Sequence, residues 1–175
     1  MRIYITSLDA YIQGNLVGKW ITLPMEEEEL HAQIQKVLKR SQKVCEDTDK
    51  HEEIFITDFE CDYMIIEEYD NITRLNQIAE IMEPFSEEDR KKVQFLIDNS
   101  FVSNIDEAVE KYDEVHIYEN QTMEDVAYEI INDCYDIDNI EPLIARNINY
   151  EAIGRELEMD GIYYEVENSI YEYRY

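Results

Sequence analysis

Residues 1–68 combine short alternating runs of apolar and polar positions with one longer helical repeat. The runs at 2–6 and 16–23 have strand character and flank a glycine-containing turn, so they predict two antiparallel strands. Apolar residues after Pro24 recur at intervals of three and four, which predicts an amphipathic helix, and residues 54–59 predict a third strand. We therefore expect a small ββαβ domain with an antiparallel sheet.

Residues 69–113 contain three short helical repeats in place of strands. Asn71 can cap the first helix, Ser86 and Asp89 form a capping box at the second, and Asn104 can cap the third. These signals predict a central bundle of short helices.

Residues 114–175 return to a mixture of strand and helix. A strand is expected near the start, and Thr122 with Asp125 forms a second capping box. Pro142 suits the first turn of a helix, another helix is expected at 150–159, and the alternating tail predicts a closing hairpin. The whole chain is thus predicted to be α+β, with three small domains at 1–68, 69–113 and 114–175. The capping box opens a helix whose stripe of apolar residues we expect to be buried: Val126, Ala127, Ile130, Ile131 and Cys134.

The composition adds a strong acidic imbalance. The 175 residues include 42 Asp and Glu against 15 Lys and Arg, a formal net charge of −27. Self-repulsion of this size destabilises the compact state, so the imbalance indicates a cationic partner. Bare nucleic acid is excluded as a ligand, because affinity for phosphate comes from clustered Lys and Arg. The 14 Tyr and the 45% hydrophobic content exclude a disordered acidic tail.

Enzyme chemistry has few candidate residues in this chain. His31, His51 and His116 occur in three separate contexts, and the four glycines form no phosphate-binding loop. Three widely spaced cysteines without a C-x-x-C pair predict neither disulfides nor a zinc site, so we expect reduced, buried thiols. No apolar run reaches the roughly 18 residues of a membrane span. The sequence therefore predicts a cytoplasmic, non-enzymatic protein with no cofactor, no metal and no membrane partner.

A row of carboxylates is the most informative charged pattern. Asp125, Glu129, Asp133 and Asp136 fall at intervals of four, four and three, about 6 Å apart along a helix. Their mutual repulsion costs helix stability, and it predicts folded-state pKa values above the unfolded ones. A merely solvated helix face remains the alternative for this row. The candidate binding surface joins the row to other carboxylates of the C-terminal half: Asp106, Glu107, Glu110, Asp113, Glu114, Glu124, Glu151, Glu156, Glu158 and Asp160.

Three segments resemble the ArdA antirestriction proteins of mobile genetic elements. Residues 3–20 contain G-x-L-x-G-x-W between Gly14 and Trp20, residues 53–60 are similar to that family's E-x-x-x-x-D-[YF]-E strand, and residues 147–157 are similar to its YIDYEAxxRDL segment. Asn149, Ile153 and Glu156 depart from the usual residues of the last segment, but the acidic character stays.

The resemblance implies an elongated homodimer of three small domains that mimics B-form DNA. Such a mimic would block type I restriction-modification enzymes by occupying the DNA-binding groove of their methyltransferase and specificity subunits. The 27 net charges match at most about 46 Å of duplex, or about 14 base pairs. The rival interpretation is an acidic immunity or antitoxin-type inhibitor of another basic protein.

Two local features bear on this resemblance. The C-terminal hairpin has more aromatic surface than one small sheet face easily buries, and the family implies a dimer formed through this end. Packing of these side chains within the core alone is the alternative. A basic patch that includes Lys36, Arg40 and Lys43 is not needed by a phosphate mimic. The residues expected at the dimer interface are Tyr163, Tyr164, Tyr171, Tyr173 and Tyr175.

Overall fold

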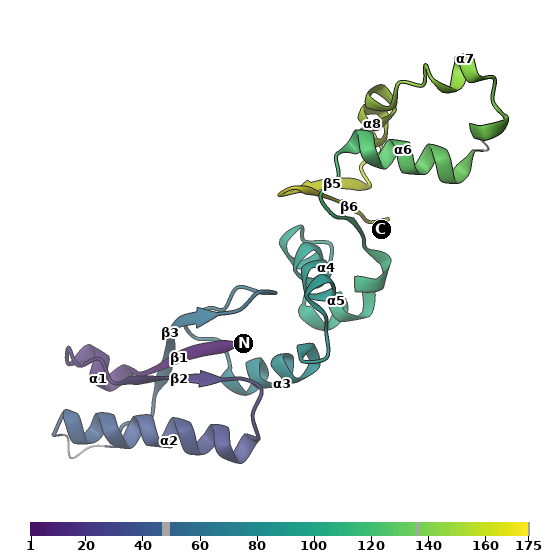
Figure 1. The fold of residues 1–175 in the computed structure, drawn as a ribbon. Coiled ribbons are helices and arrows are strands. Elements are labelled where there is room, and N and C mark those ends of the chain that lie inside the picture. Colours follow the sequence, from purple (N-terminus) through teal and green to yellow (C-terminus); the bar gives the residue numbers. More distant parts are fainter. Residues whose placement is uncertain (47–49, 136, 175) are drawn as a thin grey trace. The chain divides into compact units, whose positions relative to one another are not determined.

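The structure is a computed structural model that describes residues 1–46, 50–135 and 137–174. It is α+β, with two three-stranded antiparallel sheets (Figure 1). The chain divides into two compact units, Met1–Ile97 and Asp98–Tyr175, which we call unit 1 and unit 2. The three-domain division expected from the sequence stays a prediction, and each unit is described by itself.

Unit 1 contains the first sheet and a long helix that covers one face of it. The strand order is β2-β1-β3, and both edge strands pair antiparallel with β1. Ile3 and Ile5 of β1 point to the same face as Ile21 of β2, where they pack against Leu30 and Val37 of the helix. The predicted strands and helix are confirmed as β1 (Arg2–Ser7), β2 (Gly18–Thr22), α2 (Glu27–Val44) and β3 (Ile54–Glu60).

A short helix, α1 (Leu8–Ile12), interrupts the predicted hairpin between β1 and β2. Ser7 caps it by accepting a hydrogen bond from the backbone N–H of Ala10. The order is therefore βαβαβ, and the expected ββαβ order was incomplete. Five residues are too few for a helical period to stand out in the sequence.

Two helices complete unit 1, and their predicted caps are confirmed. The Asn71 side chain accepts a hydrogen bond from the N–H of Arg74 at 3.0 Å. The Ser86 hydroxyl accepts from the N–H of Asp89 at 3.1 Å, and the Asp89 carboxylate accepts from the N–H of Ser86 at 3.1 Å. The helices are α3 (Ile72–Met82), whose buried residues join the core beneath the first sheet, and α4 (Glu87–Asp98).

Unit 2 contains the second sheet, in the order β4-β6-β5, and a set of short helices. Asn104, Thr122 and Pro142 start helices as predicted, and the tail forms the predicted hairpin. The elements are α5 (Ile105–Lys111), η1 (Tyr112–Glu114), β4 (His116–Tyr118), α6 (Met123–Cys134), η2 (Ile137–Asn139), α7 (Pro142–Ala145), α8 (Tyr150–Met159), β5 (Tyr163–Val166) and β6 (Ser169–Glu172).

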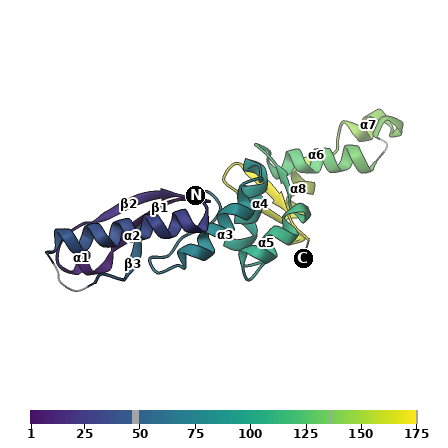
Figure 2. The same ribbon diagram turned by 90° about the horizontal axis from the view of Figure 1, so that it is seen from below.

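Helices α6 and α8 of unit 2 lie side by side and pack against each other (Figures 1 and 2). Gly154 of α8 is buried at the contact, where an added Cβ atom would lie 2.6 Å from the carbonyl oxygen of Met123. Val126 of α6 packs with Tyr163 and Ile170 of the hairpin. The missing side chain of Gly154 is thus what lets the two helix backbones approach.

Two burial predictions were wrong. The apolar stripe of α6 is buried only at Val126 and Ala127, while Ile130 and Ile131 are half-buried and Cys134 is exposed. Cys45 and Cys61 are half-buried, so none of the three free thiols is fully enclosed. The strands of the second sheet are only three or four residues long, so this sheet is shorter than the 12-residue α6 and leaves the end of the stripe partly uncovered. Within the described ranges, no helix is both long enough and apolar enough to span a membrane.

Candidate acidic binding surface

The carboxylates singled out in the sequence all lie in unit 2, which holds 21 of the 42 Asp and Glu but only four of the 15 Lys and Arg. We call this set the acidic surface. Glu107 is half-buried, the other described members are exposed, and Asp136 lies outside the described residues. Its members are Asp106, Glu107, Glu110, Asp113, Glu114, Glu124, Asp125, Glu129, Asp133, Asp136, Glu151, Glu156, Glu158 and Asp160.

The α6 row does not behave as four equivalent charges. The Asp125 carboxylate accepts hydrogen bonds from the Thr122 hydroxyl at 2.6 Å and from the Thr122 N–H at 2.9 Å. These bonds lower the pKa of Asp125, so the expected rise in pKa is wrong at this residue. Glu129 accepts a hydrogen bond from the Gln121 amide at 2.7 Å. The helix ends at Cys134, so the row follows one helix face only as far as Asp133.

Three of the four cations of unit 2 contact carboxylates of the same unit. Lys111 Nζ lies 2.9 Å from Glu107, Arg155 lies 3.5 Å from Glu151, and Arg174 lies 2.7 Å from Glu172. The Ser103 N–H and then Lys111 lower the pKa of Glu107. Few cations are thus left to offset the other carboxylates.

The position of each carboxylate along its helix separates structural charges from unexplained ones. Glu124 and Asp125 lie in the first turn of α6 and Glu151 in the first turn of α8, where the helix dipole favours negative charge. Asp133 lies in the last turn of α6, and Glu156 and Glu158 lie in the last turn of α8. Neither last turn contains a basic residue, so these three carboxylates reduce helix stability.

The tyrosines expected at a dimer interface mostly pack inside unit 2. Tyr163, Tyr171 and Tyr173 are buried, and Tyr164 is half-buried with its ring centroid 5.2 Å from that of Phe101. Packing within the unit, the alternative to a dimer contact, therefore accounts for these side chains, with Phe101 and a helix also contacting them, and the dimer interface stays a prediction. Tyr175 lies outside the described residues.

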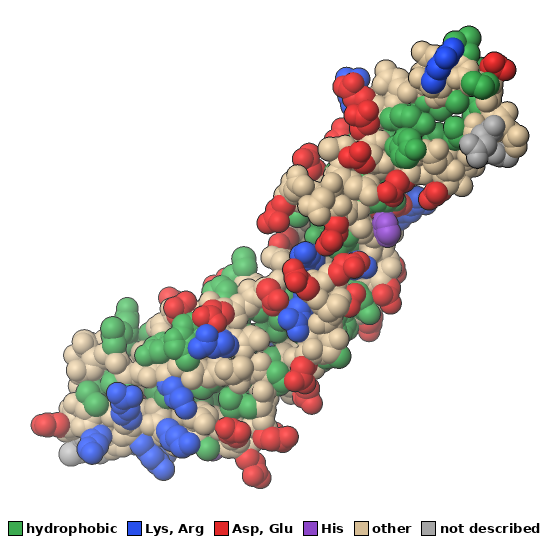
Figure 3. Space-filling model, in the orientation of Figure 1, with side chains coloured by type: hydrophobic (Ala, Val, Ile, Leu, Met, Phe, Trp, Pro, Cys, Tyr) green, Lys and Arg blue, Asp and Glu red, His purple; other side chains and the backbone are tan. Residues whose placement is uncertain are grey.

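Sequence reasoning missed a set of exposed apolar side chains in unit 2. Leu143 and Ile144 of the four-residue helix α7 are 58% and 61% exposed, and Met159 is 84% exposed. Two consecutive large apolar residues in so short a helix were the available signal, because one turn cannot bury both. Figure 3 shows hydrophobic side chains gathered beside α7. The set comprises Tyr128, Tyr135, Leu143, Ile144 and Met159.

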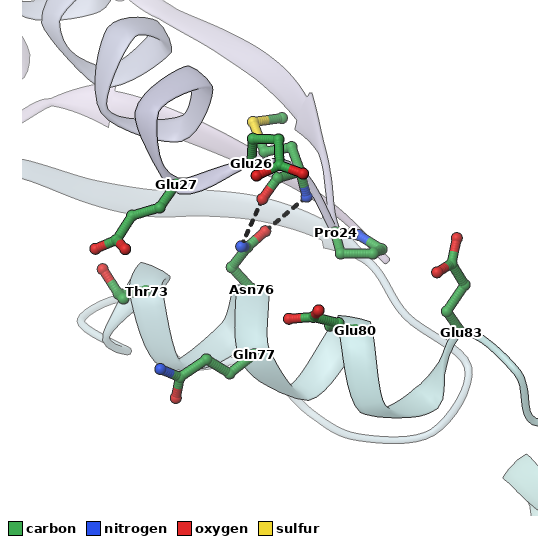
Figure 4. A pocket seen from close by; sticks show the side chains of 9 residues that line it. Pro24, Glu26, Glu27, Thr73, Asn76, Gln77, Glu80 and Glu83 are labelled. Atoms are coloured by element: carbon green, nitrogen blue, oxygen red, sulfur yellow. Dashed lines mark hydrogen bonds between the residues drawn. The ribbon is translucent and has the colours of Figure 1, made fainter.

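Unit 1 has a cavity of about 470 Å³ between the start of α2 and the side of α3 (Figure 4). The Asn76 amide donates to the carbonyl of Met25 at 2.8 Å and accepts from its N–H at 2.9 Å, which ties the two elements together. Among the described residues, no group of His, Cys, Asp and Glu is arranged to hold a metal ion. The lining residues are Pro24, Met25, Glu26, Glu27, Thr73, Asn76, Gln77, Glu80 and Glu83.

Comparison with known proteins assigns the chain to a family. The family model described as Antirestriction protein (ArdA) matches residues 3–172, which include nearly all of both units. Among curated proteins, none matches closely enough to count as a relative. Members of the matched family are inhibitors that act against type I restriction enzymes. The chain therefore belongs to the ArdA family of antirestriction proteins.

Proposed function

We propose that the protein inhibits type I restriction-modification enzymes as a DNA mimic, by occupying the DNA-binding groove of the specificity and methyltransferase subunits. The observation that carries this proposal is the placement of Asp133, Glu156 and Glu158 in the last turns of α6 and α8. Each reduces the stability of its own helix, at about 0.3–1 kcal/mol at low ionic strength. A fold that keeps such charges exposed offers them to a cationic surface outside the chain.

The amount of charge supports DNA as the molecule that is mimicked. Unit 2 has 21 carboxylates and four Lys or Arg, which leaves a net charge of −17. Duplex DNA has one negative charge per about 1.7 Å of axis, so this unit matches at most about 29 Å of duplex. The protein would act by binding alone, through side chains that contact the Lys and Arg of the groove.

We also propose that the protein acts as a homodimer. The exposed side chains of Leu143, Ile144 and Met159 offer an apolar surface of the kind that marks contacts between proteins. A second copy would cover this surface and double the length of acidic surface presented to the enzyme. Because Tyr163, Tyr171 and Tyr173 are buried within the unit, the apolar set beside α7 is the better candidate for the contact.

Competition with DNA tests the proposed mimicry. A purified type I methyltransferase core should bind either this protein or a duplex with its recognition site, and the protein should displace DNA from enzymes that read different sequences. Affinity should fall as salt rises, because the contacts are between charges. A stable ternary complex of enzyme, protein and site-containing DNA in one groove would refute the mimicry. Inhibition of a single cognate enzyme would favour the immunity-type alternative.

A further inference from the structure

Unit 1 has a basic patch that the acidic surface does not explain. Lys36, Lys39, Arg40 and Lys43 are exposed on the face of α2 that points away from the sheet, and Lys19 of β2 lies beside this helix. Figure 3 shows Lys and Arg side chains gathered on this part of the molecule. The opposite face of α2 is buried through Leu30, Val37, Leu38 and Ser41. We call the five cations the basic patch.

The two stretches of sequence that contain the basic patch have no carboxylate, and the nearest one along the chain is Glu46, three residues after Lys43. Residues 10–25 and 30–45 contain none of the 42 Asp and Glu, although they include all of β2 and most of α2. Lys19 Nζ donates to the neutral Gln33 amide oxygen at 2.6 Å. Within the described ranges, the four cations of α2 contact no carboxylate, whereas the α4 lysines pair with Glu87 and Glu88. Among the described residues, most of the other cations thus pair with carboxylates, whereas the four cations of α2 do not.

Helix stability does not account for the basic patch. A helix dipole favours cations within about one turn of the C-terminus, which on α2 includes Lys43. Lys36 with Arg40, and Lys39 with Lys43, are like-charge pairs at a spacing of four, which destabilises a helix. The arrangement thus reduces the stability of α2 and indicates an anionic partner.

We infer that the basic patch binds the phosphate backbone of double-stranded DNA. A stripe of Lys and Arg along one helix face is typical of nucleic-acid binding. The stripe from Lys36 to Lys43 is about 10 Å long, which matches about three phosphates of one strand. Helix α2 has no Phe, Tyr or Trp on which unpaired bases could stack, which favours a duplex over a single strand. Trp20 packs against Tyr4 and Arg2, on the sheet face that α2 does not cover.

The net charge of the chain does not prevent this contact. Charges are screened beyond about 8 Å at physiological ionic strength, so distant carboxylates act weakly on the patch. The net charge argues against nucleic acid for the chain as a whole, and the basic patch is a local reversal of its sign. The patch lies in unit 1 and the acidic surface in unit 2, so the inference does not depend on the proposed mimicry.

Fluorescence anisotropy with a labelled duplex of about 20 base pairs in about 50 mM salt tests the inference, because duplex contacts are strongest at low salt. The variant K36Q/K39Q/R40Q/K43Q should weaken binding at least tenfold. It should also reduce the slope of log affinity against log salt by about 2.7, at about 0.9 for each of about three phosphate contacts. The matched variant K50Q/K91Q/K92Q/K111Q removes four lysines that already pair with carboxylates, and it should change binding less than twofold.

Three results would overturn the inference: no duplex binding by the parent protein, equal losses in both variants, or displacement of the duplex by polyglutamate of equal charge. The last result would identify an acidic protein as the partner. Circular dichroism establishes that both variants are folded, and Lys39→Gln alone should give a partial loss. The variant K36Q/K39Q/R40Q/K43Q should still inhibit restriction, because the acidic surface is unchanged. Duplex binding and inhibition therefore test the DNA-binding inference and the proposed mimicry independently.

Discussion

Asp125 stabilises the start of α6 and also adds to the acidic surface. Thr122→Ala removes the cap and should lower the free energy of unfolding by about 1 kcal/mol, whereas Thr122→Ser keeps the hydroxyl and should change it little. Urea unfolding at neutral pH measures both values. If Thr122→Ala had the same free energy of unfolding as the parent, the capping role would be contradicted. Asp125 would then have no structural role at the start of α6.

The capping bonds also set the sign of a pH effect. Hydrogen bonds from Thr122 lower the folded-state pKa of Asp125, so in acid the unfolded state binds its proton first. The stabilisation is therefore fully present above the usual Asp pKa of about 3.8 and is lost as pH falls through the lower folded-state pKa. We expect Asp125→Asn to destabilise at pH 7 and to lose this effect as pH falls below the usual Asp pKa and through the lower folded-state pKa. A variant that is more stable than the parent at pH 7 would show that repulsion in the row outweighs the cap.

At the scale of elements, Gly154 controls the approach of α6 and α8. Ala normally favours a helix by about 1 kcal/mol over Gly, but here its Cβ would meet the Met123 backbone at 2.6 Å. Gly154→Ala should therefore destabilise the protein, by about 1–3 kcal/mol for an overpacked contact. Glu156→Ala, on the exposed face of the same helix, should stay within about 0.5 kcal/mol of the parent. A stabilised Gly154→Ala variant in thermal unfolding would show that the two helices can separate without loss.

Helix starts were the best predicted elements, because their signal is local. Asn71, Ser86, Asn104 and Thr122 each bond to a backbone N–H within three residues, so a few positions of sequence determine the cap. Burial depends instead on which segments pack together. The exposure of Cys134 and the closeness of α6 and α8 at Gly154 both follow from tertiary contacts that the helical period of α6 does not contain.

The candidate site was predictable as a set of charges but not as a set of roles. Composition identified the acidic half of the chain, and in the structure the described members of the set are exposed except for the half-buried Glu107. The sequence did not separate Asp125, which caps a helix, from Asp133, which lies in a last turn with no basic residue. The packing of the hairpin tyrosines was not predictable for a related reason, because Phe101 covers Tyr164 and Tyr173 from a distant position in the chain.

At the scale of the whole molecule, charge is sorted by location and not only by amount. Unit 2 keeps three carboxylates, Asp133, Glu156 and Glu158, in the last turns of its helices, and unit 1 keeps like-charged cations four residues apart on α2. Both arrangements reduce stability in the free protein and gain from a partner of opposite charge. Added salt should therefore stabilise the free protein at neutral pH while weakening its complexes, because screening reduces both repulsion within the chain and attraction to the partner.

The carboxylates in helix last turns give the sharpest test of this trade between stability and binding. The variant D133N/E156Q/E158Q should be more stable than the parent at low salt, by a few tenths of a kcal/mol per group, because it relieves unfavourable helix dipole interactions. It should also inhibit a type I enzyme about tenfold less well, since exposed charge pairs contribute about 0.2–1 kcal/mol each. Single replacements should do little, because a mimic distributes its binding over many contacts.

The matched variant E27Q/E28Q/E29Q removes the same charge from the first turn of α2, where the dipole favours it. Both variants remove three negative charges, so only the location of the removed charge differs between them. The α2 variant should be less stable than the parent and should inhibit the enzyme equally well. Unfolding midpoints and inhibition titrations measured at two salt concentrations separate the two effects. If both variants lost inhibition equally, net charge alone would explain the activity. The carboxylates of the acidic surface would then contribute no more to inhibition than those of α2.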